Sequence, residues 1–272
     1  MSSWINGRRG SSIWASDRGL QYGDGLFETM RIRGRGVRLL DYHLERLLAG
    51  CRRLQLNAPD VRLLEREVMG RASLRSSGVL KLIITRGRGA RGYRPSGEER
   101  CTRVLSLHAL GPSARVALQP VRIRVCATRV GLNPALAGLK TLNRLESVMA
   151  RAEWRDARIW DGLMLDVDGN VVSGTMSNVF LRRGSTLMTP VLDRCGIAGV
   201  MRRWVLGQAP PLGLRVWQGR LPLESIRDAE EMFMTNAVAG IVSVGRIEHG
   251  AARFGLAGRE TADRLRARLE LL

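Results

Sequence analysis

Residues 138–146 have the sequence GLKTLNRLE and include Lys140, one of only two lysines in the chain. Lysines and arginines together number 44, so the other 42 are arginines. Arginine stays charged, whereas a nucleophile that forms an imine must be an amine that can become neutral. The two lysines are therefore the first candidates for covalent chemistry.

The surroundings of the two lysines differ. Lys140 lies just before a helix that we predict over 142–157, with Thr141 as its N-cap. The positive end of a helix dipole disfavours an ammonium, which favours a neutral, nucleophilic amine at Lys140. Lys81 lies in the β-rich run 79–85, where a lysine commonly extends from a strand face into solvent. A lysine on a surface turn is the alternative for Lys140, and the depletion of lysine argues against it.

The composition is that of an ordinary enzyme. The 272 residues suffice for about two domains of roughly 150 residues each, and 44% of them are hydrophobic. No apolar run approaches the ~20 residues of a membrane span, and the N-terminus lacks the apolar stretch of a secretory signal, so we expect a cytoplasmic protein. The four cysteines and three histidines are scattered, so we expect neither disulfides nor a bound metal.

A breaker cluster at 111–113 divides the chain. We predict a smaller N-terminal α/β domain over 1–113 and a larger C-terminal α/β domain over 120–272 that carries Lys140. In the first domain we expect a hairpin over 30–39, a helix capped by Asp41 that continues to 54, and strands over 79–85 and 104–110.

Strands and helices also follow one another in the second half. We expect strands over 121–125 and 232–235, a hairpin over 163–172, and helices over 142–157, from 200 to 205 and from about 261. The fold class is therefore α+β.

The basic excess permits a nucleic-acid partner but does not favour one. Against 44 basic residues there are 25 acidic ones, which gives a formal charge of +19. The arginines are spread over the whole length, and aromatic residues for base stacking make up only 5%. Charge alone indicates solubility and nonspecific attraction, so we consider nucleic-acid binding unlikely.

Residues 87–92, GRGARG, match the dinucleotide fingerprint G-x-G-x-x-G after a strand. The fingerprint needs a helix at its last glycine, but Pro95 and Gly97 stand where that helix would run. We interpret the segment as an ordered loop that presents Arg91 and Tyr93 to an anionic ligand, with a plain solvent loop as the alternative.

A phosphate site is indicated in the second half. The turn 196–201, GIAGVM, leads into a helix N-terminus, where unpaired backbone N–H groups can bind phosphate. Arg46, on the helix of the first half, is a candidate cationic donor to the same phosphate. An imine-forming lysine together with a phosphate site suggests pyridoxal phosphate.

Five segments together resemble the fold-type IV pyridoxal phosphate enzymes. These segments are Ser16–Glu28 (SDRGLQYGDGLFE), His43-x-x-Arg46, Lys140–Arg144 (KTLNR), Gly174–Asn178 (GTMSN) and Gly196–Arg202 (GIAGVMR). The family includes branched-chain and D-amino acid aminotransferases and 4-amino-4-deoxychorismate lyase. The matches run from about residue 4 to 245, and residues 86–93 and 138–146 look most like the aminodeoxychorismate lyases.

The resemblance implies two α/β domains with pyridoxal phosphate in the cleft between them, and a homodimer. It assigns the cofactor imine to Lys140, and the phosphate to Arg46 and to the helix N-terminus at Gly199, Val200 and Met201. It places the substrate near five residues: Phe27, Arg91, Tyr93, Asn236 and Ala237.

One position departs from the family pattern. The family usually has Glu in a Thr-Glu-Gly motif, which holds a proton on the pyridine nitrogen, but this chain has Val172-Ser173-Gly174. A serine hydroxyl can donate to an unprotonated nitrogen and leaves a weaker electron sink. Elimination that creates an aromatic ring needs this sink less than transamination does, so Ser173 favours a lyase. Reduced or lost activity is the other interpretation of Ser173.

We therefore predict a lyase that converts 4-amino-4-deoxychorismate to 4-aminobenzoate and pyruvate, in folate biosynthesis. Lys140 would remove the C4 proton, and the enolpyruvyl group would leave as the ring becomes aromatic. Arginines such as Arg91 would bind the carboxylates of this anionic substrate. The alternatives are an aminotransferase of the same fold, acting on D-amino or branched-chain amino acids, and a non-enzymatic basic nucleic-acid-binding protein.

Overall fold

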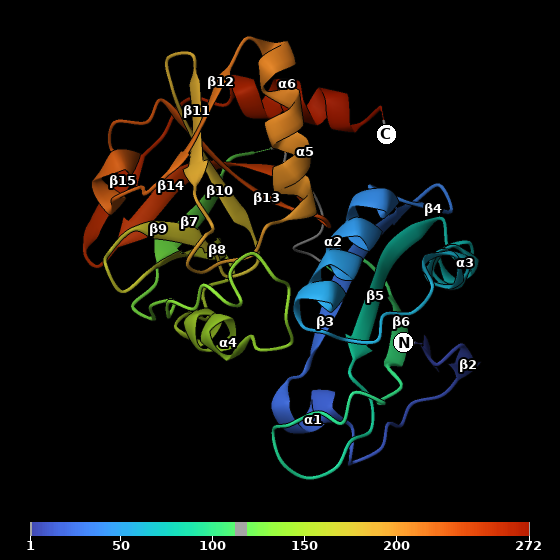
Figure 1. Cartoon of the computed structure of the whole chain (residues 1–272). Helices are drawn as coiled ribbons and strands as arrows, with labels where there is room; N and C mark the ends of the chain where they lie inside the picture. Colours follow the sequence, from blue (N-terminus) through green and yellow to red (C-terminus); the bar gives the residue numbers. More distant parts are fainter. Residues whose placement is uncertain (1, 112–118, 272) are drawn as a thin grey trace. The chain divides into compact units, whose positions relative to one another are not determined.

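The computed structural model describes residues 2–111 and 119–271 (Figure 1). Its contacts divide the chain into two units, Met1–Pro112 with Leu139–Asn143, and Ser113–Gly138 with Arg144–Leu272. The predicted domain boundary falls largely on residues 112–118, which lie outside the described residues. Lys140, which we predicted in the C-terminal domain, is instead part of the first unit, because the segment around it contacts that unit.

The first unit is built on a six-stranded antiparallel sheet with the order β2-β1-β6-β5-β3-β4. The strands are β1 (Ser2–Ile5), β2 (Arg8–Arg9), β3 (Gly25–Arg33), β4 (Gly36–Val37), β5 (Ser77–Thr85) and β6 (Thr102–His108). Side chains alternate along β3, so that Leu26, Glu28 and Met30 are buried while Phe27 and Thr29 are half-buried on the other face. The predicted hairpin and both predicted strands are confirmed.

Three helices belong to this unit: α1 (Arg18–Tyr22), α2 (Leu40–Arg53) and α3 (Val61–Ala72). The predicted cap Asp41 is wrong, because Leu39 is the N-cap, with a left-handed φ of 56° after β4, and the helix begins at Leu40, two residues earlier than predicted. Helix α3 was not predicted from the sequence. Asp60 is its N-cap and accepts from the Leu63 amide at 2.9 Å, a capping residue that could have indicated the helix.

The second unit is built on a nine-stranded mixed sheet with the order β12-β11-β10-β13-β14-β7-β8-β9, in which β15 also pairs with β14. The strands are β7 (Val121–Val125), β8 (Ile159–Leu165), β9 (Val171–Gly174), β10 (Asn178–Arg183), β11 (Thr186–Pro190), β12 (Arg215–Gly219), β13 (Glu231–Asn236), β14 (Gly240–His249) and β15 (Ala252–Gly255). Strand β7 pairs in parallel with both β14 and β8. Strands β8 and β9 form the hairpin that we predicted over 163–172. The long strand β14 was not predicted from the sequence.

The helices of this unit are α4 (Leu145–Ala152), α5 (Val200–Gln208) and α6 (Glu260–Leu269), with short 3-10 turns over Pro210–Leu212 and Leu223–Ile226. The predicted helix 142–157 is too long at both ends, and its predicted cap Thr141 is wrong. Thr141 forms a β-bridge with Leu26 of β3 instead, and α4 begins after Arg144. None of the helices in the described ranges is long and apolar enough to cross a membrane.

Candidate functional site

The backbone around Lys140 pairs with the first residues of β3. The Phe27 amide donates to the Lys140 carbonyl at 3.0 Å, and the Leu142 amide donates to the Gly25 carbonyl at 3.0 Å. The Lys140 Nζ lies 4.2 Å from the centre of the Phe27 ring. The structure thus brings two predicted site residues together. Since α4 begins only at Leu145, the helix-dipole argument for Lys140 does not hold.

Lys81, which we had set aside, lies beside the same ring. Its Nζ is 5.2 Å from the centre of the Phe27 ring. Phe27 pairs with Ile83, and Lys81, two residues before Ile83 on β5, lies on the same sheet face. Both lysines of the chain therefore meet at Phe27. Only the register of β3 against β5 reveals this, and a single sequence does not contain it.

The opposite face of β3 carries a buried charge cluster made of Glu28, His43 and Arg46. His43 Nδ1 lies 2.6 Å from Glu28 Oε2, and Arg46 Nε donates to Glu28 Oε1 at 2.8 Å. A second nitrogen of the Arg46 guanidinium also donates to Glu28 Oε2. Glu28 and His43 are each only 1% exposed. One carboxylate thus holds two side chains that are one turn apart on α2.

The protonation states in this cluster follow from its contacts. Burial raises the pKa of Glu28, but the charge of Arg46 and the hydrogen bonds from His43 and Arg46 outweigh it and lower the pKa to about 2. Burial lowers the pKa of His43, and the hydrogen bond to Glu28 opposes this shift. Glu28 is therefore ionised and His43 neutral at pH 7, so the His43 Nδ1–H donates to the carboxylate.

This cluster fixes Arg46, which we predicted as a phosphate donor. The sequence analysis did not anticipate its Glu28 partner, because the two residues lie 18 positions apart on different elements. A bidentate carboxylate orients a guanidinium firmly. Binding of a phosphate by Arg46 stays a prediction.

In the second unit, the N-terminus of α5 forms a glycine-lined turn. Gly199 is the N-cap, in an extended conformation, and no side chain caps the helix. A Cβ atom on Gly199 would lie 2.1 Å from Asn178 Oδ1, so this position needs glycine. Asn178 Nδ2 donates to the Ile197 carbonyl at 2.8 Å and holds the turn in place. With no acidic residue in its first turn, α5 fits an anion at Val200 and Met201.

Ser173 lies on β9, half-buried, opposite Met164 of β8. The neighbouring carboxylate is Asp161, which is fully buried and accepts from the Thr175 and Ser177 hydroxyls at 2.5 and 2.6 Å. Burial raises the pKa of Asp161, and these hydrogen bonds oppose the shift. Asp161 therefore holds the turn after β9, and a contact between Ser173 and a cofactor stays a prediction.

Asn236 and Ala237 lie where β13 ends. Asn236 Oδ1 accepts from the Val238 and Ala239 amides at 3.0 and 2.7 Å, so its side chain shapes the turn into β14. Thr235 pairs with Asn178, the residue that holds the α5 turn. Two predicted parts of the site in the second unit, the turn at 236–237 and the N-terminus of α5, thus share strand β10 as a support.

Arg91 and Tyr93 lie in the loop between β5 and β6, and no helix follows Gly92 in this described loop. Arg18 anchors the loop by donating to the Gly92 and Tyr93 carbonyls at 2.8 and 2.7 Å. Tyr93 is 86% exposed. Within residues 2–111 and 119–271, neither Arg91 nor Tyr93 forms a hydrogen bond or an ion pair with Lys140. Their contact with a substrate stays a prediction.

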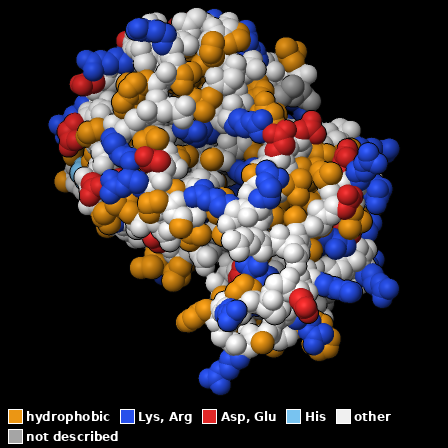
Figure 2. Space-filling view, in the orientation of Figure 1, with side chains coloured by type: hydrophobic (Ala, Val, Ile, Leu, Met, Phe, Trp, Pro, Cys, Tyr) orange, Lys and Arg blue, Asp and Glu red, His pale blue; other side chains and the backbone are white. Residues whose placement is uncertain are grey.

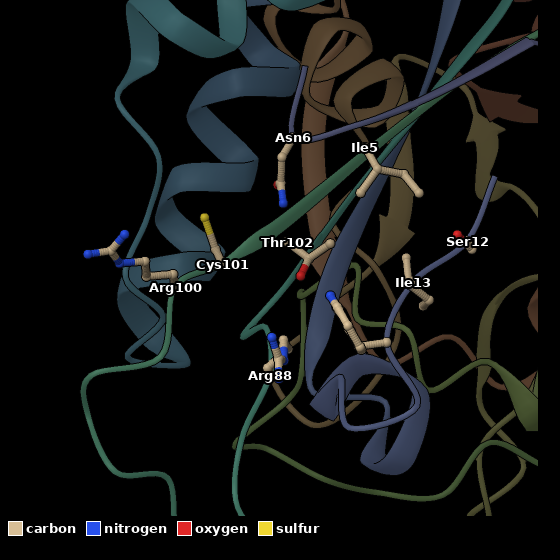
Figure 3. Close-up of a pocket in the computed structure, with 9 residues that line it drawn as sticks. Ile5, Asn6, Ser12, Ile13, Arg88, Arg100, Cys101 and Thr102 are labelled. Carbon is tan, nitrogen blue, oxygen red and sulfur yellow. The ribbon is translucent and has the colours of Figure 1, made fainter. Parts of the chain in front are cut away.

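The first unit also contains a separate cavity (Figure 3). Its lining residues are Ile5, Asn6, Ser12, Ile13, Trp14, Arg88, Arg100, Cys101 and Thr102. The Arg88 guanidinium stacks on Trp14, 4.3 Å from the ring centre, whereas the Arg100 side chain points away from the other labelled residues. None of the predicted site residues lines this cavity, so it is distinct from the surroundings of Lys140.

An antiparallel sheet in one unit and a mixed sheet in the other make up the architecture of the fold-type IV pyridoxal phosphate enzymes. The chain matches the Amino-transferase class IV family over residues 25–247 and belongs to this family.

Its relatives include an aminodeoxychorismate lyase of Vibrio harveyi, 36% identical over 246 residues, which cover 90% of each chain. The crystal structure of the 4-amino-4-deoxychorismate lyase from Pseudomonas aeruginosa is similar, with 41% identity, 98% of each chain covered and a TM-score of 0.91. A hypothetical aminotransferase from Mycobacterium tuberculosis in its PLP-bound form shares the fold at 19% identity, with a TM-score of 0.80 and 99% of each chain covered.

Proposed function

We propose that this protein is an aminodeoxychorismate lyase, which converts 4-amino-4-deoxychorismate to 4-aminobenzoate and pyruvate. The observation that carries the proposal is the similarity, over nearly the whole chain, to lyases of this name at 36% and 41% identity. A putative branched-chain-amino-acid aminotransferase of Methanocaldococcus jannaschii is more distant, at 31% identity over 263 residues.

The residues present fit pyridoxal phosphate. Lys140 supplies an amine beside Phe27, and the α5 turn supplies a cradle that a Cβ at Gly199 would fill. We propose that Lys140 binds the cofactor aldehyde, that Arg46, Val200 and Met201 bind its phosphate, and that Ser173 faces its pyridine nitrogen. When bound, pyridoxal phosphate supplies an electron sink for the electrons left at substrate C4.

The protein residues then move the protons. Once the amino group of the substrate has displaced Lys140, the free Lys140 Nζ would remove the proton from C4 of the substrate, and the bond between the ring and the enolpyruvyl oxygen would break as the ring becomes aromatic. The proton returns to the methylene carbon of the enolpyruvyl group, which leaves as pyruvate. Phe27 packs against Lys140, and the nearby ammonium of Lys81 attracts an anionic substrate to this face of the sheet.

Ser173 supports the lyase over the second candidate, an aminotransferase of the same family. A hydroxyl cannot keep the pyridine nitrogen protonated as a carboxylate does, so the electron sink is weaker. Transamination relies on that sink throughout, whereas the gain of aromaticity helps to drive the elimination.

The face of the molecule seen in Figure 2 does not support the nucleic-acid alternative. Figure 2 shows basic side chains scattered over the visible face, with hydrophobic and acidic ones between them and no single stripe. A protein that tracks a phosphate backbone concentrates its arginines along one path.

The deciding experiment is a product assay on purified protein supplied with pyridoxal phosphate. Aminodeoxychorismate should yield 4-aminobenzoate and pyruvate in equal amounts, while D-alanine or leucine with 2-oxoglutarate should yield far less amino-group transfer. Borohydride should trap the cofactor on a peptide that contains Lys140. Transfer without pyruvate release would identify an aminotransferase, and a colourless protein that binds DNA or RNA in a salt-dependent way would refute both enzymes.

A further inference from the structure

Trp14 and Arg88 belong to the wall of the cavity in the first unit. The segments that carry them pair with each other, because the Gly89 amide donates to the Ser16 carbonyl at 3.1 Å and Asp17 forms a β-bridge with Arg88. This pairing places the Arg88 guanidinium over the Trp14 ring, 4.3 Å from its centre. Trp14 is 65% exposed, so the cavity has an aromatic wall that is open to solvent.

The charge of Arg88 has no acidic partner in the described part of the chain. Within residues 2–111 and 119–271, no carboxylate forms an ion pair with its side chain, and no acidic residue lines the cavity. A guanidinium that stacks through its plane keeps the N–H donors on its edge available, and these donors match the two oxygens of a carboxylate. Trp14 thus orients Arg88 without occupying its donors.

The buried carboxylate closest in sequence to this wall, Asp17, is engaged by the protein itself. It is 1% exposed, and it accepts from the Thr85 and Thr102 hydroxyls at 3.0 and 2.7 Å and from the Gly19 amide at 2.8 Å. Thr102 lines the cavity and Asp17 does not. The charge that faces the cavity is therefore that of Arg88.

Asn6 supplies a second donor. It lies in the turn between β1 and β2, where its amide donates to the Arg103 carbonyl and its Oδ1 accepts from the Arg103 amide, both at 2.9 Å. These two bonds fix the side chain, and no residue of the described ranges accepts a hydrogen bond from its Nδ2. Asn6 thus has a fixed N–H group that is available to an acceptor in the cavity.

The two sides of the cavity differ in chemistry. In Figure 3, Asn6, Thr102 and Arg88 lie along one side, and Ile5 and Ile13 lie along the other. The volume is about 260 Å³, just below the range of about 300 to 1,000 Å³ that is typical of pockets for drug-sized ligands. A matching ligand is therefore small, anionic at one end and apolar at the other.

We propose that this cavity binds a small carboxylate with an apolar body, of about the size of benzoate. The carboxylate accepts from the edge of the Arg88 guanidinium and from Asn6 Nδ2, while the apolar body packs against Ile5 and Ile13. Gly87, with a φ of 97°, shapes the site, because a Cβ there would overlap the Arg100 carbonyl. The site thus gives a role to the glycine-rich segment 87–92, whose dinucleotide pattern the fold does not use.

Benzoate is the probe, titrated into the protein supplied with pyridoxal phosphate and followed by the methyl NMR signals of Ile5 and Ile13. The wild type should bind it with a dissociation constant of about 1 mM or lower. Acetate, which lacks the apolar body, and benzamide, which lacks the charge, should each bind at least about tenfold more weakly. Arg88→Gln should weaken benzoate binding at least about tenfold, and Trp14→Leu at least about threefold, since Arg88 then loses the ring that orients it.

The matched control is Arg62→Gln, which removes the same charge from an exposed arginine of α3 outside the cavity. It should leave the dissociation constant within about twofold of the wild type, because solvent screens a distant exposed charge. Circular dichroism should show every variant folded.

Three results would overturn the proposal. The first is equal benzoate affinity in the wild type and Arg88→Gln, and the second is acetate or benzamide that binds as tightly as benzoate. The third is a benzoate titration that shifts only the signal of Ile83, which pairs with Phe27 on the sheet face of Lys140. Because these signals report binding itself, the result does not depend on the proposed lyase reaction.

Discussion

Glu28→Gln tests the buried cluster beneath the site. The substitution keeps the size of the side chain but removes the charge that holds Arg46 and His43. Glutamine also brings an NH2 group, a hydrogen-bond donor that would face the N–H donors of Arg46 and His43. The Arg46 guanidinium, at 14% exposure of its side chain, then lacks the carboxylate that compensates it.

The structure sets the size of the effect. A pKa lowered from 4.5 to about 2 corresponds to about 3 kcal/mol at pH 7, at about 1.4 kcal/mol for each pH unit. Removing one partner of a buried ion pair costs about 3 to 5 kcal/mol in general. Both arguments give a loss of at least about 3 kcal/mol in the free energy of unfolding.

The effect also has a pH dependence of known sign. The pKa of Glu28 is depressed in the folded state, so its contribution is fully present above pH 4.5 and is lost as the pH falls towards about 2. The free energy gap between the wild type and Glu28→Gln should therefore shrink over that window. His43 also makes the wild type sensitive to acid. Burial lowers its pKa in the folded state, so the unfolded chain binds the proton at a higher pH than the folded chain does, and stability falls as the pH falls.

Urea unfolding followed by tryptophan fluorescence and circular dichroism, from pH 7 to pH 3, measures this gap. Glu65→Gln on the exposed face of α3 is the control and should change the free energy of unfolding by less than about 0.5 kcal/mol. A loss below about 1 kcal/mol at pH 7 for Glu28→Gln, or a gap that stays constant down to pH 3, would refute the reasoning.

Substitutions at three further positions address the proposed cofactor site. Lys140→Arg should abolish pyruvate release and borohydride trapping while the fold stays intact, because arginine cannot become the neutral amine; Lys81→Arg, the matched control, should keep both. Ser173→Ala should weaken cofactor binding by about 0.5 to 1.5 kcal/mol in a titration, and Ser173→Glu should raise half-transamination of D-alanine relative to pyruvate release; unchanged values in both variants would show that Ser173 does not face the pyridine nitrogen. Gly199→Ala should reduce cofactor affinity, since its Cβ would lie 2.1 Å from Asn178 Oδ1, whereas Gly207→Ala on the same helix has open space and should not; equal affinities would contradict the role of the α5 turn.

Several features of this protein are readable from the sequence alone, because they rest on residue identity and local spacing. The near absence of lysine singles out Lys140, and glycines at 196 and 199 mark the start of α5. Alternating apolar residues predict β3 and β5, since a strand exposes every second side chain to one face. These signals lie within a few residues of one another along the chain.

Other features depend on segments that are distant in the sequence, and only the tertiary structure decides them. Residues 140–142 have the composition of a helix start, but hydrogen bonds to β3 satisfy their backbone groups and delay α4 to Leu145. The register of β3 with β5 brings Lys81 to the ring beside Lys140, and the packing of α2 brings Arg46 to Glu28. Helical periodicity predicts an apolar face on α4, but only the structure shows that Leu145, Val148 and Met149 are exposed, because an apolar face has the same spacing whether or not it meets the core of its own unit.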